Sequence, residues 1–155
     1  ASRNSRRWQQ TAALVLREEI DEANQRQDLV GIKRTKDGRG WGVFAKRHFD
    51  VGDLVISAEG LKTSSHQGSH TIQTGWNKHV YMNLPARFLN HVCGKATVGI
   101  RANTKGAYDF VAIAPLPQGD EVVWDYECSE FELDNFTCAC GLPTCRGKLR
   151  GFQDH

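Results

Sequence analysis

Three closely spaced cysteines place the tightest constraint on how this chain can fold. Cys138, Cys140 and Cys145 lie in the stretch CACGLPTCRG with the spacing C-x-C-x4-C. A structural zinc site takes four thiolate or imidazole ligands in a tetrahedron, and one loop can supply three of them at this spacing. The pattern predicts a metal-bound loop whose fourth ligand comes from elsewhere. Cys93, in the stretch NHVC, is the first candidate.

The remaining cysteine, Cys128, brings the total to five. An odd number does not fit a disulfide framework of a secreted protein. The first ten residues, ASRNSRRWQQ, also lack the apolar core of a secretory signal. We therefore expect an intracellular, reducing compartment, where clustered cysteines are more often metal ligands than bridges.

Size and composition fit one globular domain. The chain has 155 residues, 39% of them hydrophobic and 25% charged, which is enough to bury a core. No apolar run approaches the roughly 20 residues that span a bilayer, so no membrane partner is predicted. The net charge of +2 is too small to predict direct nucleic-acid binding.

The periodicity predicts a mainly β fold with short helices. Residues 7–27 place Leu14, Ile20 and Ala23 near helical spacing, with Trp8 at the head, and predict an N-terminal flanking helix. Downstream, short segments rich in β-branched and aromatic residues alternate with Gly, Asp, Asn and Pro, which is typical of many short strands joined by turns. Inside this region NLPARFLNHV, residues 83–92, is the one candidate for a short helix.

Three further motifs each allow a plain structural interpretation. Glycines at 38, 40 and 42 suit a tight turn near a ligand, but equally a simple hairpin, and no phosphate-loop signature follows. Asn90 and His91 in RFLNHVC are polar groups entering an apolar run and need partners if buried. Tyr126 in GDEVVWDYE could orient a nucleophile or belong to the core. The acidic run at 120–134 is either solvated surface or a dock for a basic peptide.

The order of these motifs is more specific than any one of them. Taken together in this order, the motifs G-x-G-W-G, R-F-x-N-H-x-C, G-D-E-V-V-W-D-Y and C-x-C-x4-C-R-G resemble the SET-domain protein lysine methyltransferases with a post-SET zinc loop. The resemblance implies several small β-sheets and a C-terminal pseudoknot that brings RFLNHVC beside WDYE. It divides the sequence into a flanking helix (1–29), a SET domain (30–127) and a post-SET zinc-binding segment (128–155).

The resemblance also implies roles for individual residues. S-adenosylmethionine would be the methyl donor and S-adenosylhomocysteine the product, with Tyr126 as the catalytic tyrosine. The fourth ligand of a structural zinc would be Cys93, beside Cys138, Cys140 and Cys145, which leaves Cys128 as the odd thiol. The positions that would bind the cofactor are Arg39, Gly40, Trp41, Arg87, Asn90 and His91.

Two departures from the family pattern fall on the expected lysine channel. Ala58 stands where the family often has an aromatic residue, and Trp124 stands where it usually has Phe or Tyr. We hypothesise that the two changes compensate in volume. The loop NHVCGKA also lacks the usual Ser, Pro and Asn around its cysteine, and the segment between Ser57 and Val80 looks like a minimal version of the family's substrate-groove insert.

The leading interpretation is a protein lysine N-methyltransferase acting on a histone tail, which would be a nuclear chromatin enzyme in a eukaryote. One alternative is a catalytically weak SET module that serves as a peptide-binding adaptor, and another is a methyltransferase of a non-histone protein. A third is a zinc-stabilised structural domain, which the three cofactor-type motifs disfavour. Cofactor binding separates the third from the others, and turnover separates an enzyme from an adaptor.

Overall fold

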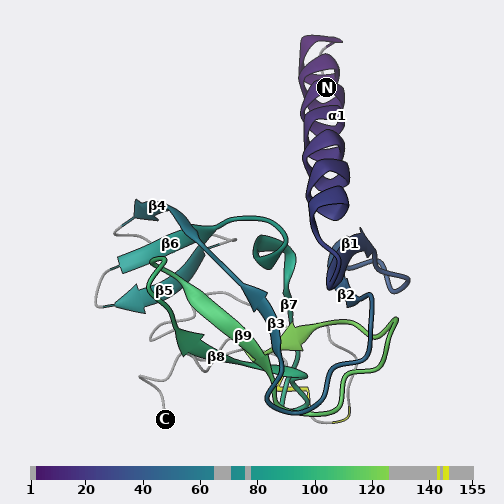
Figure 1. Ribbon diagram of the computed structural model, residues 1–155. Helices are drawn as coiled ribbons and strands as arrows, with labels where there is room; N and C mark the ends of the chain where they lie inside the picture. Colours follow the sequence, from purple (N-terminus) through teal and green to yellow (C-terminus); the bar gives the residue numbers. More distant parts are fainter. Residues whose placement is uncertain (1–2, 65–70, 76–77, 126–142, 144, 147–155) are drawn as a thin grey trace.

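A long N-terminal helix and four small β-sheets make up the described part of the molecule (Figure 1). The computed structural model describes residues 3–64, 71–75, 78–125, 143 and 145–146. The helix projects from the body of the molecule, with the first two strands at its foot (Figure 1). Within the described residues, no helix is both long and apolar enough to cross a bilayer.

Helix α1 (Arg3–Arg26) is anchored to the body by its last turns. Ile20 is 2% exposed, and Leu16 and Ala23 pack beside it against the core. The Asn24 side chain binds both the backbone N–H and the carbonyl of Ile32, at 2.7 and 3.0 Å. Lys46 Nζ donates to two carbonyls at the end of the helix, where carbonyls have no partner within the helix, and its charge favours this end of the helix dipole.

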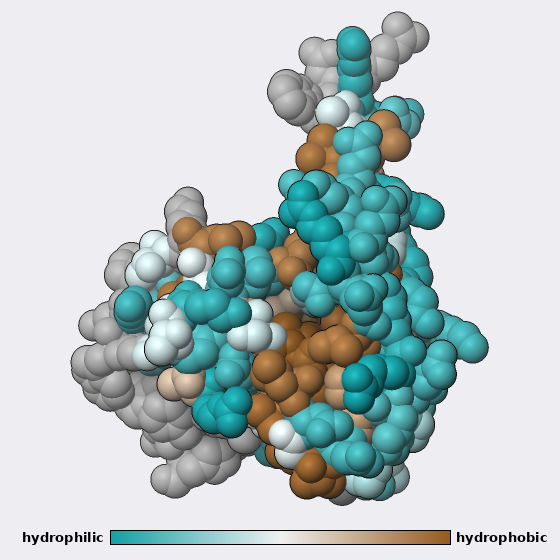
Figure 2. Space-filling view, in the orientation of Figure 1, coloured by the Kyte–Doolittle hydropathy of each residue, from teal (hydrophilic) through white to brown (hydrophobic). Residues whose placement is uncertain are grey.

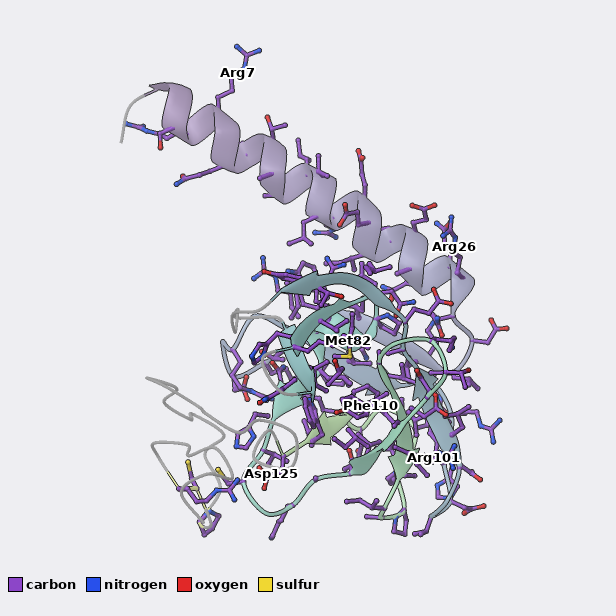
Figure 3. All side chains as sticks on the ribbon, turned by 90° about the vertical axis from the view of Figure 1, so that its left-hand side faces the viewer. Arg7, Arg26, Met82, Arg101, Phe110 and Asp125 are labelled. Carbon is purple, nitrogen blue, oxygen red and sulfur yellow. The ribbon has the colours of Figure 1, made fainter. Side chains whose placement is uncertain are left out.

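The first half of α1 points away from the body (Figure 3). Leu14, expected near the packed face, is 65% exposed, and Val15 is 49% exposed. Leu16 takes the packed position because the body of the molecule ends near this turn of the helix. The apolar stripe of α1 therefore extends past the surface of the body that it could cover. Figure 2 shows apolar side chains on this projecting part and a larger apolar area on the face of the body below it.

Two antiparallel units form the framework of the body. Strands β1 (Val30–Arg34) and β2 (Trp41–Ala45) form a hairpin with Val30 opposite Ala45. Strands β3 (Leu54–Ser57), β9 (Tyr108–Ala112) and β8 (Val98–Ala102) form a sheet in the order β3-β9-β8. Their inward side chains form one core, in which Val43, Val55 and Phe110 are at most 2% exposed.

The segment expected to be a minimal insert contains a sheet of its own. Strands β4 (Gly60–Ser64), β5 (Thr71–Gly75) and β6 (Lys78–Met82) pair antiparallel in the order β4-β6-β5. The sheet joins the rest of the fold closely at Gly60, where an added Cβ would lie 2.5 Å from the Gly106 carbonyl oxygen. The sequence patterns did not single out β4 or β6.

The short helix expected at 83–92 is only a single 3-10 turn, η1 (Ala86–Phe88). Asn90–His91 after it is extended as β7 and pairs in parallel with β10 (Val123–Trp124). Val92 N–H continues this pairing by donating to the Trp124 carbonyl at 3.1 Å. The predicted meeting of RFLNHVC with WDYE is therefore confirmed for the residues described.

Candidate functional site

A glycine turn joins β1 to β2 at one side of the β7–β10 pair. Gly38 and Gly40 have φ angles of 81° and 103°, which other residues rarely adopt. Thr35 N–H donates to the Gly40 carbonyl at 2.7 Å and closes the base of the turn. The hairpin interpretation and the ligand-turn interpretation are thus compatible, because the turn is a hairpin that faces β7.

The Arg39 side chain is held by two carboxylates. Its Nη2 lies 2.5 and 3.0 Å from the two carboxylate oxygens of Glu121, and its Nε donates to Asp37 at 2.7 Å. Desolvation acts to lower the pKa of Arg39, but the bonds to Glu121 and Asp37 outweigh it and raise this pKa. Desolvation likewise acts to raise the pKa of Asp37, and the Arg39 hydrogen bonds reverse this and lower it.

Asn90 ties strand β7 to the hairpin. Its Nδ2 donates to the Trp41 carbonyl at 3.0 Å, and the Arg34 guanidinium lies over the Trp41 ring at 4.7 Å from its centroid. Gly42 lets these segments approach, since an added Cβ would lie 3.2 Å from Asn90 Nδ2 and 3.3 Å from the Glu121 carboxylate carbon. A side chain at position 42 would therefore require these neighbouring side chains to shift.

Arg87, the third residue expected at the cofactor's amino-acid end, lies in η1. Its Nε donates to the Met82 carbonyl at 3.0 Å, and the residue is half-buried. The described neighbours thus fix its stem at the end of β6.

On the other side of β10, four residues form a connected cluster. His91 Nε2 lies 3.2 Å from Cys93 Sγ, and His91 Nδ1 lies 3.8 Å from Asp125. Arg146 binds both oxygens of Asp125, at 2.7 and 2.8 Å, and its backbone N–H donates to Cys93 Sγ at 3.4 Å. The structure therefore brings the end of the cysteine cluster to Cys93, which is 1% exposed.

The two residues expected to line the lysine channel are both buried in the core. Ala58 is 0% exposed; its N–H donates to the Tyr108 carbonyl and its own carbonyl accepts from Asn103. Trp124 is 5% exposed and packs edge-to-face against Phe110, with ring centroids 5.6 Å apart. Figure 3 shows Phe110 inside the body and Asp125 near its edge.

Several predicted residues lie outside the described part of the sequence: Tyr126, Cys128, Cys138 and Cys140. Among the residues that are described, no three or more His, Cys, Asp or Glu side chains are arranged so that they could hold a metal ion. The zinc set and the catalytic tyrosine therefore stay predictions.

The SET domain model matches residues 40–127 of this sequence. The chain belongs to the SET-domain family. The match begins at the glycine turn and runs to the end of the GDEVVWDYE motif, so the paired strands β7 and β10 lie within the SET domain.

Curated relatives carry the same domain within much longer proteins. A variant-silencing SET domain-containing protein of Plasmodium falciparum is 28% identical over 74% of this chain and 5% of that protein. An H3 lysine-4 specific histone-lysine N-methyltransferase of Schizosaccharomyces pombe is 28% identical over 70% and 14%. Human histone-lysine N-methyltransferase 2B is 26% identical over 77% and 5%. This chain thus spans a small part of each relative.

A solved structure described under the product specificity of histone lysine methyltransferases shares the fold. The superposition has a TM-score of 0.57 at 24% sequence identity and covers 77% of this chain and 56% of the other. At this identity the likeness concerns the SET fold alone.

Sequence reasoning missed three residues of the site: Glu121, Asp125 and Arg146. Two of them lie in the acidic run at 120–134, which the sequence allowed only as solvated surface or as a peptide dock. The excess of acidic residues in this run was visible in the sequence, but its pairing with Arg39 and Arg146 depends on the threading of the whole fold.

Proposed function

We propose that this SET domain transfers methyl groups from S-adenosylmethionine to lysine side chains, with a histone tail as the substrate. The observation that carries the proposal is the parallel pair of β7 and β10, which sets His91 beside Trp124 and Asn90 against the β1–β2 hairpin at Trp41. Two relatives named as histone-lysine N-methyltransferases support it.

The proposed cofactor site follows the hairpin and β7. S-adenosylmethionine, when bound, supplies an electrophilic methyl group on a sulfonium cation. The fit of this segment rests on its glycines: an added Cβ at Gly38 or Gly40 would meet none of the described residues within 4 Å, so the backbone of the turn is open to a ligand, and Gly42 lets Asn90 approach the hairpin. The residues that would hold the cofactor are Arg39, Gly40, Trp41, Arg87, Asn90 and His91.

The protein's own residues would prepare the lysine to react. A free lysine has a pKa of about 10.4 and is protonated at neutral pH, so it cannot attack as a nucleophile. Burial beside Trp124 and Ala58 would disfavour the ammonium form and lower that pKa. Tyr126 directly follows Asp125 in the sequence. Its hydroxyl would orient the amine, at an approach of roughly 3 Å.

We assign a structural zinc to Cys93, Cys138, Cys140 and Cys145. Four thiolates leave no open position for water, so the metal would hold the fold together rather than react. The contact between Arg146 N–H and the buried Cys93 sulfur fits this assignment, because it brings the last cysteine of the cluster next to the proposed fourth ligand. Cys128 stays outside the set.

The acidic run at 120–134 would receive the basic residues that flank the target lysine. Its opposite charge would favour a histone tail over a neutral peptide. A histone substrate would make the protein a nuclear chromatin enzyme. The proposed boundaries are 1–29 for the flanking helix, 30–127 for the SET domain and 128–155 for the post-SET segment.

The decisive experiment is methyl transfer from labelled S-adenosylmethionine to core histones by zinc-replete protein. Tyr126→Phe should reduce the rate by about 100-fold, a loss typical of removing a positioned catalytic hydroxyl, with cofactor binding unchanged. Tyr81→Phe, a change of the same size at a half-buried position in strand β6, is the matched control and should leave the rate within about threefold, since Tyr81 is not among the residues of the proposed site.

Each outcome separates the candidates. Label on one histone that disappears in Tyr126→Phe supports the enzyme. Label on other basic proteins but not on histones would reject the histone substrate. Cofactor binding without transfer to any basic peptide would reject the enzyme in favour of a peptide-binding adaptor, and failure to bind the cofactor would reject both.

A further inference from the structure

We propose that Glu121 is a positioning residue for the cofactor: it clamps Arg39 and so fixes the glycine turn against β10, without itself touching cofactor or substrate. The inference rests on the proposed function, because it assigns the turn at 37–41 to cofactor binding. Glu121 and Arg39 lie 82 positions apart in sequence, and their contact joins the first hairpin to the strand that leads toward Tyr126.

Glu121 and Arg39 form a close and mostly buried ion pair. One guanidinium nitrogen of Arg39 reaches both Glu121 oxygens, at 2.5 and 3.0 Å, and a second nitrogen binds Asp37 at 2.7 Å. The Glu121 side chain is 13% exposed and that of Arg39 25%, so water competes only partly for the pair. Asp37, whose side chain is 51% exposed, binds Arg39 nearer the surface and gives it a second support.

Glu121 is itself held in place on three sides. Its backbone forms an antiparallel bridge with Phe44, and its carbonyl accepts from Thr97 Oγ1 at 3.4 Å. The next residue along, Val122, donates its N–H to the Val43 carbonyl at 2.7 Å. The carboxylate therefore projects from a fixed point, and Arg39 is restrained relative to β10 rather than merely neutralised.

The turn needs such a restraint. Gly38 and Gly40 both have positive φ, and glycine allows many other backbone conformations at little cost. The hydrogen bond from Thr35 to Gly40 closes the base of the turn but does not fix its tip. Loss of the clamp would let the tip sample other shapes, and the cofactor would have to select the competent one, which weakens binding.

The charges also exclude a direct role for the Arg39 side chain as an anion site. Arg39 carries one positive charge, whereas Asp37 and Glu121 together carry two negative charges at neutral pH. The trio is therefore net negative and would repel the carboxylate of an amino-acid ligand. The side chain of Arg39 is committed to the protein, which leaves its backbone for the cofactor.

The test compares Glu121→Gln, Arg39→Met and the double variant with the wild type. Dissociation constants for S-adenosylhomocysteine are measured by calorimetry, steady-state KM and kcat by transfer assay, and stability by urea unfolding. Each single variant should raise Kd and KM by about tenfold with kcat changed less than about threefold. The double variant should be no worse than either single one, because both remove the same contact.

Two further variants exclude a merely structural effect. Arg101→Met breaks an exposed pair with Asp109 at 3.3 Å on another sheet, and should cost similar stability while leaving Kd unchanged. Glu121→Asp keeps the charge and should recover part of the affinity. Unchanged Kd in Glu121→Gln, or losses that add in the double variant, would overturn the clamp while the transferase stands. Wild-type binding with no turnover would instead reject the transferase and leave the clamp supported by Kd alone.

Discussion

Strand β10 lies between two acidic residues, and each of them holds an arginine from a distant part of the sequence. Glu121 precedes the strand and binds Arg39; Asp125 follows it and binds Arg146. The two carboxylates are almost equally buried, at 13% and 15% exposure, so the ion pairs themselves are closely alike. What differs is the structure around each pair.

On the Arg39 side, the restraints on the glycine turn come from groups of the protein and need no metal. A second carboxylate, a backbone hydrogen bond and the close packing at Gly42 all restrain the same turn. On the Arg146 side, the backbone N–H of that residue donates to the sulfur of Cys93, a proposed zinc ligand. The Arg39 anchor should therefore survive loss of the metal, whereas the Arg146 anchor should not.

The largest expected effect comes from removing the proposed metal. Cys93→Ser should abolish binding of one zinc ion per molecule and reduce methyl transfer by about 100-fold, because Arg146 would lose its contact with the Cys93 sulfur and small misplacements are costly in catalysis. Zinc content by mass spectrometry and transfer assays measure the two effects. Hydrogen exchange in the β1–β2 hairpin should stay as in the wild type.

Cys128→Ser is the matched control for that variant and should keep both zinc and activity. Equal zinc content in Cys93→Ser and Cys128→Ser would contradict the ligand set. Loss of protection in the β1–β2 hairpin of Cys93→Ser would contradict the independence of the two anchors.

A smaller effect is expected from Trp124, which lies between the anchors. Trp124→Phe removes part of a side chain that packs on Phe110, and should lower the free energy of unfolding by about 1–2 kcal/mol. If Trp124 fills the volume left by Ala58, the smaller ring widens the channel and more methyl groups are added per lysine. Mass spectrometry of the product measures this shift.

The compensation between the two positions has its own test. Ala58→Val in the Trp124→Phe background should restore the wild-type product distribution, since the summed volume is closer to the original. A product distribution that is the same in all three proteins would reject the hypothesis.

The pairing of β7 with β10 could be predicted because the ordered motifs resemble those of the SET family, whose fold brings these two segments together. The sequence also located most strands, since alternation and turn residues are read from neighbours. The exposure of Leu14 could not be read this way: helical periodicity shows which face is apolar, but not where the body that covers it ends. The same limit applies to Glu121, whose partner depends on the threading of the whole fold.

The sheet β4-β6-β5 shows a second limit of local patterns. GLKTS and KHVYM lack the long apolar runs that mark a strand. They become strands because they pair with each other across the intervening segment. Pairing energy of this kind is a tertiary property and outweighs weak local propensity. The residues that complete the zinc set and the catalytic tyrosine were predicted by motif alone.

The smallest expected effect comes from Asp37, the more exposed of the two carboxylates that bind Arg39. The folded-state pKa of Asp37 is lowered from 3.8, so its ionised form stabilises the native state above that pH, and the contribution is lost as pH falls through the folded value. Asp37→Asn should therefore cost at most about 0.5 kcal/mol at pH 7, because the pair is exposed, and less at about pH 3, below the ordinary pKa of 3.8. Urea unfolding at both pH values measures the difference. An equal cost at the two values would mean that Asp37 acts through its shape in the turn rather than through its charge on Arg39, and that Glu121 holds the arginine alone.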